Sequence, residues 1–213
     1  MYLVLGVALA TVALAAGGHA AAAERPPIAW NAIPYPAKRK SEMAAYSQRH
    51  YGVRRYGLVN PKVIVEHLTE SSTFSAAWNT FAPDIADSEL HELPGVCAHF
   101  IIDQNGKIHQ LVPISLMCRH TVGLNWTAIG IEHVGFKPSD VLGRSKVMAA
   151  SLRLTNWLRC SEGIETKNVI GHNESVQSPY HHERVARLRR QTHDDFPTSS
   201  MRKYRAALRK LTC

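Results

Sequence analysis

Two apolar stretches that lie far apart in the sequence each end on a histidine. The first, Val63–His67, begins with three consecutive β-branched residues, which favour a strand buried in a sheet. The second, Asn168–His172, is a short stretch of the same kind, and a polar cluster, His193–Asp195, follows near the end of the chain. Two imidazoles and one carboxylate, with a fourth position left for water, are a ligand set of catalytic zinc ions.

The residue types alone allow a second interpretation. Side chains alternate along a strand, so His67 shares a face with Val63 and Val65, while Glu66 points to the other face. A histidine in that place can be a rigidly held ligand or base, or a half-exposed residue that ends the strand. The spacing contains no local metal motif such as H-E-x-x-H, and among the 12 histidines of the chain chance pairs are easy to find.

Only a fold can bring these histidines together, and the sequence supplies strands and helices in alternation. A hairpin is predicted from Cys97–Ile102 and Lys107–Val112, because Asn105-Gly106 favours the positive φ angles of a tight turn. A further strand is predicted at 128–135. Helical patterns occupy 41–49, 74–81, 145–160 and 199–211. This order predicts an α/β fold, a single domain with a central mixed β-sheet flanked by helices.

The N-terminal residues predict the compartment. Residues 2–16 are apolar and uncharged, and small residues follow them, which is the pattern of a cleaved secretory signal peptide. The apolar stretch is short for a membrane span, which needs about 20 residues. We therefore expect a signal peptide at 1–23, an extended proline-rich lead-in at 24–40 and a folded domain at 41–213. The mature protein is expected in the periplasm or secreted, with no membrane anchor after cleavage.

The formal net charge of +8 favours an anionic partner. Nucleic acid, a membrane surface and anionic cell-wall material all meet that description. The chain has no zinc-finger spacing and no aromatic RNA-binding motif, and the signal peptide also disfavours a nucleic-acid partner.

Four cysteines follow the expected signal peptide, and their even number predicts disulfides in an oxidising compartment. Four cysteines allow three connectivities. We favour Cys97–Cys118 with Cys160–Cys213, because each bond joins segments that we expect to be neighbours.

Taken in order, these stretches resemble the zinc-dependent type-2 N-acetylmuramoyl-L-alanine amidase family, relatives of the peptidoglycan-recognition proteins. Val63–Thr69 and Val169–Glu174 resemble the two strands that carry the histidine ligands of the family. Residues 98–113 resemble its central hairpin, and Ile129–Glu132 resembles the strand that carries the catalytic glutamate in many members. His120, followed by Gly123, resembles an element that lines the family's cleft. The resemblance covers roughly residues 62–197 in the expected order, which is far more specific than any single motif.

The resemblance implies a site and a role for each of its residues. The zinc ligands would be His67, His172 and Asp195. Glu132 would be the general base, and His193 would stabilise the oxyanion. His120 and Asn125 are expected to bind substrate.

The segment that would carry the third ligand departs from the pattern of the family. The usual family ending is a lysine, any residue, and then the ligand aspartate followed by proline and glycine. This chain has His193-Asp194-Asp195-Phe196-Pro197 there. His193 would then replace the lysine, and the alternative is that His193 or Asp194 is itself the ligand.

Other polar residues near these motifs are expected to be structural. His133 alternates with Glu132 along the predicted strand and is expected to point outward. Glu66 and Glu174 are expected to support the ligands or to cap backbone groups.

The substrate implied by the resemblance is peptidoglycan, cut at the amide between the lactyl group of N-acetylmuramic acid and L-alanine. We expect a monomer that binds peptidoglycan or muropeptides. Two other functions stay open at this point. One is a module that binds peptidoglycan without cutting it, and the other is a zinc peptidase that cuts within the stem peptide.

Overall fold

A six-stranded sheet forms the centre of the protein. The computed structural model describes residues 23–213, so the predicted signal peptide lies outside the described residues except for its last position. The strand order is β1-β4-β3-β5-β2-β6. The strands are β1 (Ile28–Trp30), β2 (Val63–Leu68), β3 (Phe100–Ile102), β4 (Ile108–Gln110), β5 (Ala128–His133) and β6 (Val169–Gly171).

The sheet is mixed, as predicted. β3 and β4 are antiparallel and form the predicted hairpin, in which Gly106 takes a φ of 84° in the turn. All the other neighbouring strands run parallel. Parallel strands need covered faces, and the residues of β2 and β5 are accordingly buried throughout.

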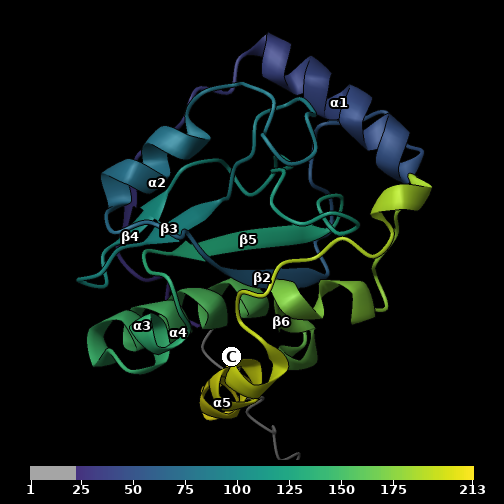
Figure 1. Ribbon diagram of the computed structural model, residues 1–213. Coiled ribbons are helices and arrows are strands. Elements are labelled where there is room, and N and C mark those ends of the chain that lie inside the picture. Colours follow the sequence, from purple (N-terminus) through teal and green to yellow (C-terminus); the bar gives the residue numbers. More distant parts are fainter. Residues whose placement is uncertain (1–22) are drawn as a thin grey trace, which may run out of the picture.

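Helices cover both faces of this sheet. In Figure 1, α1 (Ala37–Tyr51) and α2 (Phe74–Phe81) lie above it, and α3 (Ser139–Leu142), α4 (Ser145–Ser161) and α5 (Thr198–Leu208) lie below. Three short 3₁₀ helices complete the described elements: η1 (Thr166–Asn168), η2 (His172–Gln177) and η3 (Ala186–Leu188). The α/β fold with a central mixed sheet flanked by helices is therefore confirmed.

The proline-rich segment is more than a lead-in. Its residues Ile28–Trp30 add β1 to the edge of the sheet, parallel to β4, and Ile33 is buried in the core that lies under α2. The boundary expected at 40/41 lies inside α1, which begins at Ala37 after Pro36 rather than at Ser41. Proline is well suited to the start of a helix because the first N–H groups have no partner there.

Both predicted disulfides are present. Cys97–Cys118 joins the chain before β3 to the loop before β5, with 5.2 Å between the Cα atoms. Cys160–Cys213 fixes the C-terminal residue to the end of α4, with 5.4 Å between the Cα atoms. Within residues 23–213, no helix combines the length and the apolar character needed to cross a membrane.

Candidate active site

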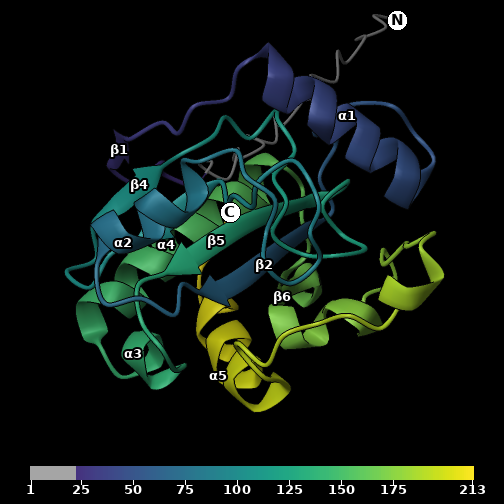
Figure 2. The ribbon, with the colours of Figure 1, turned by 45° about the horizontal axis from the view of Figure 1, so that its top comes forward.

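Three parallel strands end at the same edge of the sheet and bring the predicted residues together. β2 pairs with β5 so that His67 lies opposite Glu132. On its other side β2 pairs with β6, where Glu66 lies opposite Gly171, so the next pair along is His67 and His172. Residues in register on neighbouring strands point to the same face. Figure 2 shows β2 between β5 and β6 with its arrowhead at this edge.

The segment before α5 supplies the carboxylate. Asp195 Oδ2 accepts the backbone N–H of Leu68 at 3.2 Å, and its carbonyl accepts the N–H of Asn173 at 3.2 Å. Phe196 follows with a φ of 50° and is fully buried. Its backbone packs so closely on Gly171 that any Cβ there would overlap it. Glycine at 171 therefore lets this segment lie against the end of β6.

His67, His172 and Asp195 form a compact group. Each of them offers one ligand atom, and these atoms lie within 4.8 Å of one another. The Nδ1 atoms of both histidines face the carboxylate, at 3.4 Å from Oδ2 for His67 and 3.5 Å from Oδ1 for His172. Asp195 Oδ1 and His172 Nε2 are buried without a hydrogen-bond partner. Two imidazoles and one carboxylate at this separation are a donor set that suits a divalent cation such as zinc.

Asp195 completes this group, whereas Asp194 lies on the surface and His193 lies in the cleft beside His172. Asp194 Oδ1 accepts the side-chain N–H of Asn173 at 3.1 Å, on the surface. His193 is about half exposed, and its ring lies 4.8 Å from that of His172 between the centroids.

Burial and neighbouring charges shift the pKa values of all three residues of this group. Burial opposes ionisation of Asp195, but the hydrogen bond to His67 and the charge of His67 outweigh it and lower the pKa of Asp195 to about 2. Burial also opposes the charge on His67, yet Glu132 and Asp195 raise the pKa of that imidazole. The pKa of His172 is well below its usual value because of burial first and then His67.

Glu132 lies in the same cleft with a free oxygen. It is 7 % exposed, and its Oε2 has no hydrogen-bond partner. Burial is the main reason that its pKa is raised to about 7, with the charge of His67 acting in the opposite direction. A carboxylate with a pKa near neutrality is suited to take and return a proton.

His120 and Asn125 lie on one loop beside the ligand group. His120 Nδ1 is 3.1 Å from His67 Nε2 and 2.8 Å from Thr121 Oγ1. Asn125 is fully buried, and its Oδ1 accepts the backbone N–H groups of His120 and Thr121. Its Nδ2 donates to the hydroxyl of Tyr46 at 3.2 Å. The amide of Asn125 thus holds the loop that carries His120, and contact with substrate stays a prediction for both residues.

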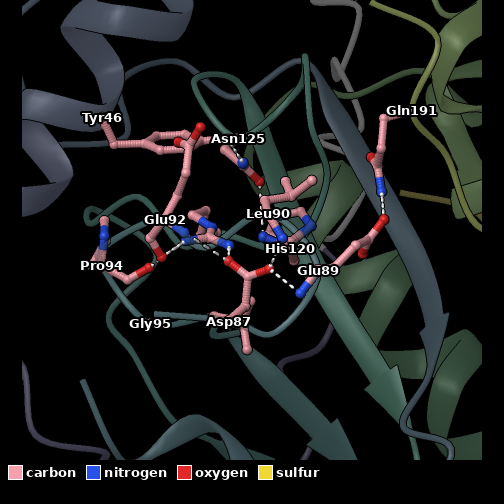
Figure 3. A network of polar contacts seen from close by, with 12 residues as sticks. Tyr46, Asp87, Glu89, Leu90, Glu92, Pro94, Gly95, His120, Asn125 and Gln191 are labelled. Carbon is pink, nitrogen blue, oxygen red and sulfur yellow. Dashed lines mark hydrogen bonds and ion pairs between the residues drawn. The ribbon is translucent and has the colours of Figure 1, made fainter. Parts of the chain in front are cut away.

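The cleft around this group has a volume of about 310 Å³ and a wall that the sequence analysis did not assign. The wall is the loop at 84–95, which contributes Asp87, Ser88, Glu89 and Leu90 to the lining. Arg119 anchors this loop through Asp87 and through the carbonyls of Glu92 and Pro94. Figure 3 labels these three residues of the loop. One signal was available in the sequence, because loops of this length are uncommon without a function.

The same loop reaches across the cleft to the segment that carries Asp195. Glu89 Oε2 lies 3.1 Å from His193 Nε2, and Glu89 Oε1 accepts the Nε2 N–H of Gln191 at 3.1 Å. Figure 3 shows Glu89 and Gln191 pointing toward each other. His193 and Glu89 are both about half exposed, so this bridge is weak and a substrate can displace it.

Comparison with known proteins agrees with this geometry. The family model for N-acetylmuramoyl-L-alanine amidase (Amidase_2) matches residues 57–195, about two thirds of the chain. The chain belongs to the N-acetylmuramoyl-L-alanine amidase family. The matched span includes all three residues of the ligand group and Glu132, and it leaves out β1, α1 and α5.

Solved structures share the fold of this amidase at low sequence identity. The endolysin amidase LysCS from Clostridium intestinale URNW has a TM-score of 0.53 at 18 % identity, and the match covers 85 % of this chain and 96 % of that one. A mutant endolysin from Bacillus subtilis has a TM-score of 0.51 at 18 % identity, covering 85 % and 98 %. A selenomethionine derivative of AmpD has a TM-score of 0.52 at 18 % identity, covering 86 % and 97 %. A search of curated proteins gave no match.

One expectation about the strand that carries Glu132 was wrong. His133 of this amidase does not point outward, because α4 and α5 cover the face of the sheet opposite Glu132. His133 is fully buried, with Nδ1 at 2.9 Å from the carbonyl of His67 and Nε2 at 2.8 Å from Ser151 Oγ. Alternation along the strand gave the correct face, but it could not say what covers that face.

Proposed function

We propose that this amidase is an exported, zinc-dependent enzyme that hydrolyses the amide between the lactyl group of N-acetylmuramic acid and L-alanine in peptidoglycan. The observation that carries the proposal is the group of His67, His172 and Asp195, which offers free lone pairs beside the unpartnered carboxylate oxygen of Glu132. Membership of the N-acetylmuramoyl-L-alanine amidase family supports the assignment of the bond that is cut.

Zinc fits the residues that are present. His67, His172 and Asp195 would hold it, and a bound dication would take the place of the proton that Glu132 and Asp195 stabilise on His67. Zinc at such a site supplies a Lewis acid and lowers the pKa of bound water to about 7. His120 and the backbone N–H of Leu68 would orient the ligands, since they contact His67 and Asp195 directly.

Glu132 and His193 perform the proton transfer and the charge stabilisation in this proposal. Glu132 takes a proton from the attacking water as its oxygen adds to the amide carbon. The ring of His193 donates a hydrogen bond to the carbonyl oxygen as negative charge develops there. Glu132 then gives its proton to the nitrogen of L-alanine, the carbon–nitrogen bond breaks, and the peptide leaves as an amine.

Export is supported by the N-terminal sequence and by the cysteines. All four cysteines are paired in disulfides, which form in oxidising compartments. We propose cleavage of residues 1–23, release into the periplasm or the medium, and action as a monomer on peptidoglycan or muropeptides.

Digestion of purified sacculi tests the reaction. Mass spectrometry should find intact stem peptides with a free L-alanine amino terminus, together with glycan that has lost its peptides. Cut stem peptides would identify a peptidase instead, and unchanged sacculi with bound protein would identify a binding module. A strong chelator should abolish the activity and added zinc should restore it, whereas full activity in chelator would refute the metal requirement.

A further inference from the structure

His50, at the end of α1, is buried between two carboxylates that come from different parts of the chain. Its Nε2 lies 2.7 Å from Glu92 Oε2 in the cleft-wall loop at 84–95. Its Nδ1 lies 2.9 Å from Glu183 Oε2 in the segment between η2 and η3. His50 and Glu183 are fully buried at their side chains, and Glu92 is 13 % exposed.

This geometry indicates which proton state of His50 the contacts need. A neutral imidazole has one N–H group, so it can donate to only one of the two carboxylates. Donation to both requires the imidazolium, whose hydrogen bonds to ionised oxygens are stronger than neutral ones. The contacts from α1 to Glu92 and to Glu183 are therefore both complete only while His50 is protonated.

Both segments held by His50 lead directly to the cleft. The loop of Glu92 contributes Asp87, Ser88, Glu89 and Leu90 to the lining, and Glu89 contacts His193 across the opening. The segment of Glu183 continues through η3 to Gln191 and His193, which line the other side. Movement at His50 therefore changes the relative position of two walls that face each other.

We propose that His50 is a positioning residue of the amidase, and that its imidazolium clamps the loop at 84–95 and the segment of Glu183 to α1 and so fixes the width of the substrate cleft. This inference rests on the proposed function for its kinetic test. His50 does not line the cleft, so it would act on the substrate only through the two segments that it holds.

The surroundings of His50 agree with a proton that is held near neutral pH. Burial acts to lower the pKa of His50, but the bonds and charges of Glu183 and Glu92 outweigh it and raise the pKa above its usual value. Glu92 is also lowered in pKa, with burial opposed by the bonds to His50 and Arg49. On α1 itself, His50 stacks on Tyr46 and lies beside Tyr51, and burial raises the pKa of both phenols.

Other cations lie near these carboxylates or near α1, but all of them are arginines. Arg49 and Arg187 lie 3.3 and 3.5 Å from Glu92, and both are about half exposed or more. Arg184 meets α1 through its backbone N–H, which donates to the carbonyl of His50. Arg119 lies over the ring of Tyr46 and holds the loop at Asp87. His50 is thus the anchor of this cleft wall that can lose a proton in the neutral to alkaline range.

The pH dependence follows from the direction of the shift. A histidine with a raised pKa gives its full stabilisation below the ordinary value of about 6.5 and loses it as pH rises through the raised value. The clamp should therefore be closed at pH 6 and weaken as the pH rises through the raised pKa of His50.

His50→Gln removes the titration and keeps a side chain that can make one contact. We expect KM for a muropeptide to rise about tenfold, with kcat changed less than about threefold, because the wall is displaced and the reacting groups are not. In the wild type, residues 84–95 should be more strongly protected from hydrogen–deuterium exchange at pH 6 than at pH 9, after correction for the intrinsic rate. In His50→Gln the exchange should be fast at both pH values.

His109→Gln is the matched control. His109 is also a buried histidine beside a carboxylate, at 3.4 Å from Asp103, but it stacks on Phe74 of α2 and does not line the cleft. Its substitution should leave KM and the exchange of 84–95 unchanged. Glu92→Gln removes the charge on the loop that faces His50 and also faces the exposed Arg49 and Arg187, and it leaves Glu183 in place. It should reproduce the KM effect even if His50→Gln is poorly folded.

Two results would overturn the clamp: wild-type KM in both His50→Gln and Glu92→Gln, or a pH-dependent exchange of 84–95 that persists in His50→Gln. The exchange measurement needs no turnover. If the enzyme fails to cut muropeptides at all, the proposed function fails while the exchange data still decide the role of His50.

Discussion

The two faces of β2 at its C-terminal end make an instructive comparison, because both carry buried histidine and carboxylate groups. On the face toward α1 lie His67 and Glu132, next to His172 and Asp195. On the face toward α4 and α5 lie Glu66 and His133. The residue types are the same and so is the burial, yet only the first face is suited to catalysis.

On the face toward α4 and α5, hydrogen bonds join all the polar side chains and leave one oxygen of Glu66 without a donor. Thr155 donates to Glu66 Oε1 at 2.8 Å, and Tyr204 lies 2.9 Å from Thr155 and 2.6 Å from Ser151. Ser151 Oγ lies 2.8 Å from His133 Nε2. Burial lowers the pKa of His133 to about 4, so its imidazole is neutral. The carbonyl of His67 accepts the Nδ1–H of that ring at 2.9 Å. One oxygen of Glu66 has no hydrogen bond and lies 3.7 Å from His133. Such a network stabilises the fold and leaves little to offer a ligand.

The face toward the cleft has acceptors in excess. Glu132 Oε2, His172 Nε2 and Asp195 Oδ1 are buried without donors. Unsatisfied buried polar atoms are rare in folded proteins, and the presence of three in the lining of one cleft is what a cation site or a reacting group would require. The comparison suggests that free lone pairs, more than residue types, distinguish a metal site from a structural network.

The largest expected effect comes from replacing one histidine on each face with alanine, in separate variants. His67→Ala should remove zinc and lower activity by roughly three orders of magnitude or more, since the zinc chemistry is lost with the ligand. His133→Ala should keep one zinc per chain and instead lower the free energy of unfolding by about 1–3 kcal/mol, through buried partners left unpaired. Metal analysis, turnover of muropeptides and denaturant unfolding measure both variants. Normal hydrolysis by His67→Ala would refute its place in the site.

The next effect separates the two glutamates. Glu132→Gln should keep zinc but lower kcat by about 10²–10⁴, because the side chain can no longer take a proton. Glu66→Gln should stay within a few-fold of wild-type activity. Comparable losses in the two variants would mean that the cleft glutamate has no special role as a base.

Much of this division could be predicted from the sequence, because strands impose a period. The β-branched run before His67 identified β2, and alternation placed Glu66 and His67 on opposite faces. The α/β pattern predicted a mixed sheet but not the order of its strands, and the structure supplies the parallel pairing of β2 with β5 and β6 that brings the strand ends together. The third ligand could not be derived in this way, since Thr192–Pro197 is irregular and has no period that would separate Asp194 from Asp195.

Features that depend on tertiary contacts could not be predicted from the sequence. The burial of His133 depends on Ser151 and Tyr204, which come from helices later in the chain. The cleft wall at 84–95 depends on Arg119, which follows the β3–β4 hairpin in the sequence and bonds to Asp87. Neither contact has a local signal, because each joins residues whose spacing in the sequence is arbitrary.

A smaller effect is a pH dependence confined to Glu66. Burial is the main reason that its pKa is raised to about 7, so the folded state keeps a proton that the unfolded state releases above the ordinary value of 4.5. Glu66 therefore stabilises the fold fully below pH 4.5, and that contribution is lost as pH rises to about 7. Relative to Glu66→Gln, the wild type should lose at most on the order of 3 kcal/mol over this interval. Urea unfolding of both proteins in chelator measures the difference, and parallel pH curves would show that Glu66 does not titrate in this way.

The smallest effect tests one hydrogen bond on each face. Thr155→Val removes the donor to Glu66 and should cost about 1 kcal/mol of stability with zinc binding and turnover unchanged. Thr121→Val removes a hydroxyl that lies 2.8 Å from His120 and 3.3 Å from His67, and should lower zinc affinity by about tenfold or more with little change in stability. Zinc titration and urea unfolding of the pair decide the matter. If both variants lost stability and neither lost zinc affinity, the two faces would be equally structural, and the excess of acceptors on the cleft face would not mark a metal site.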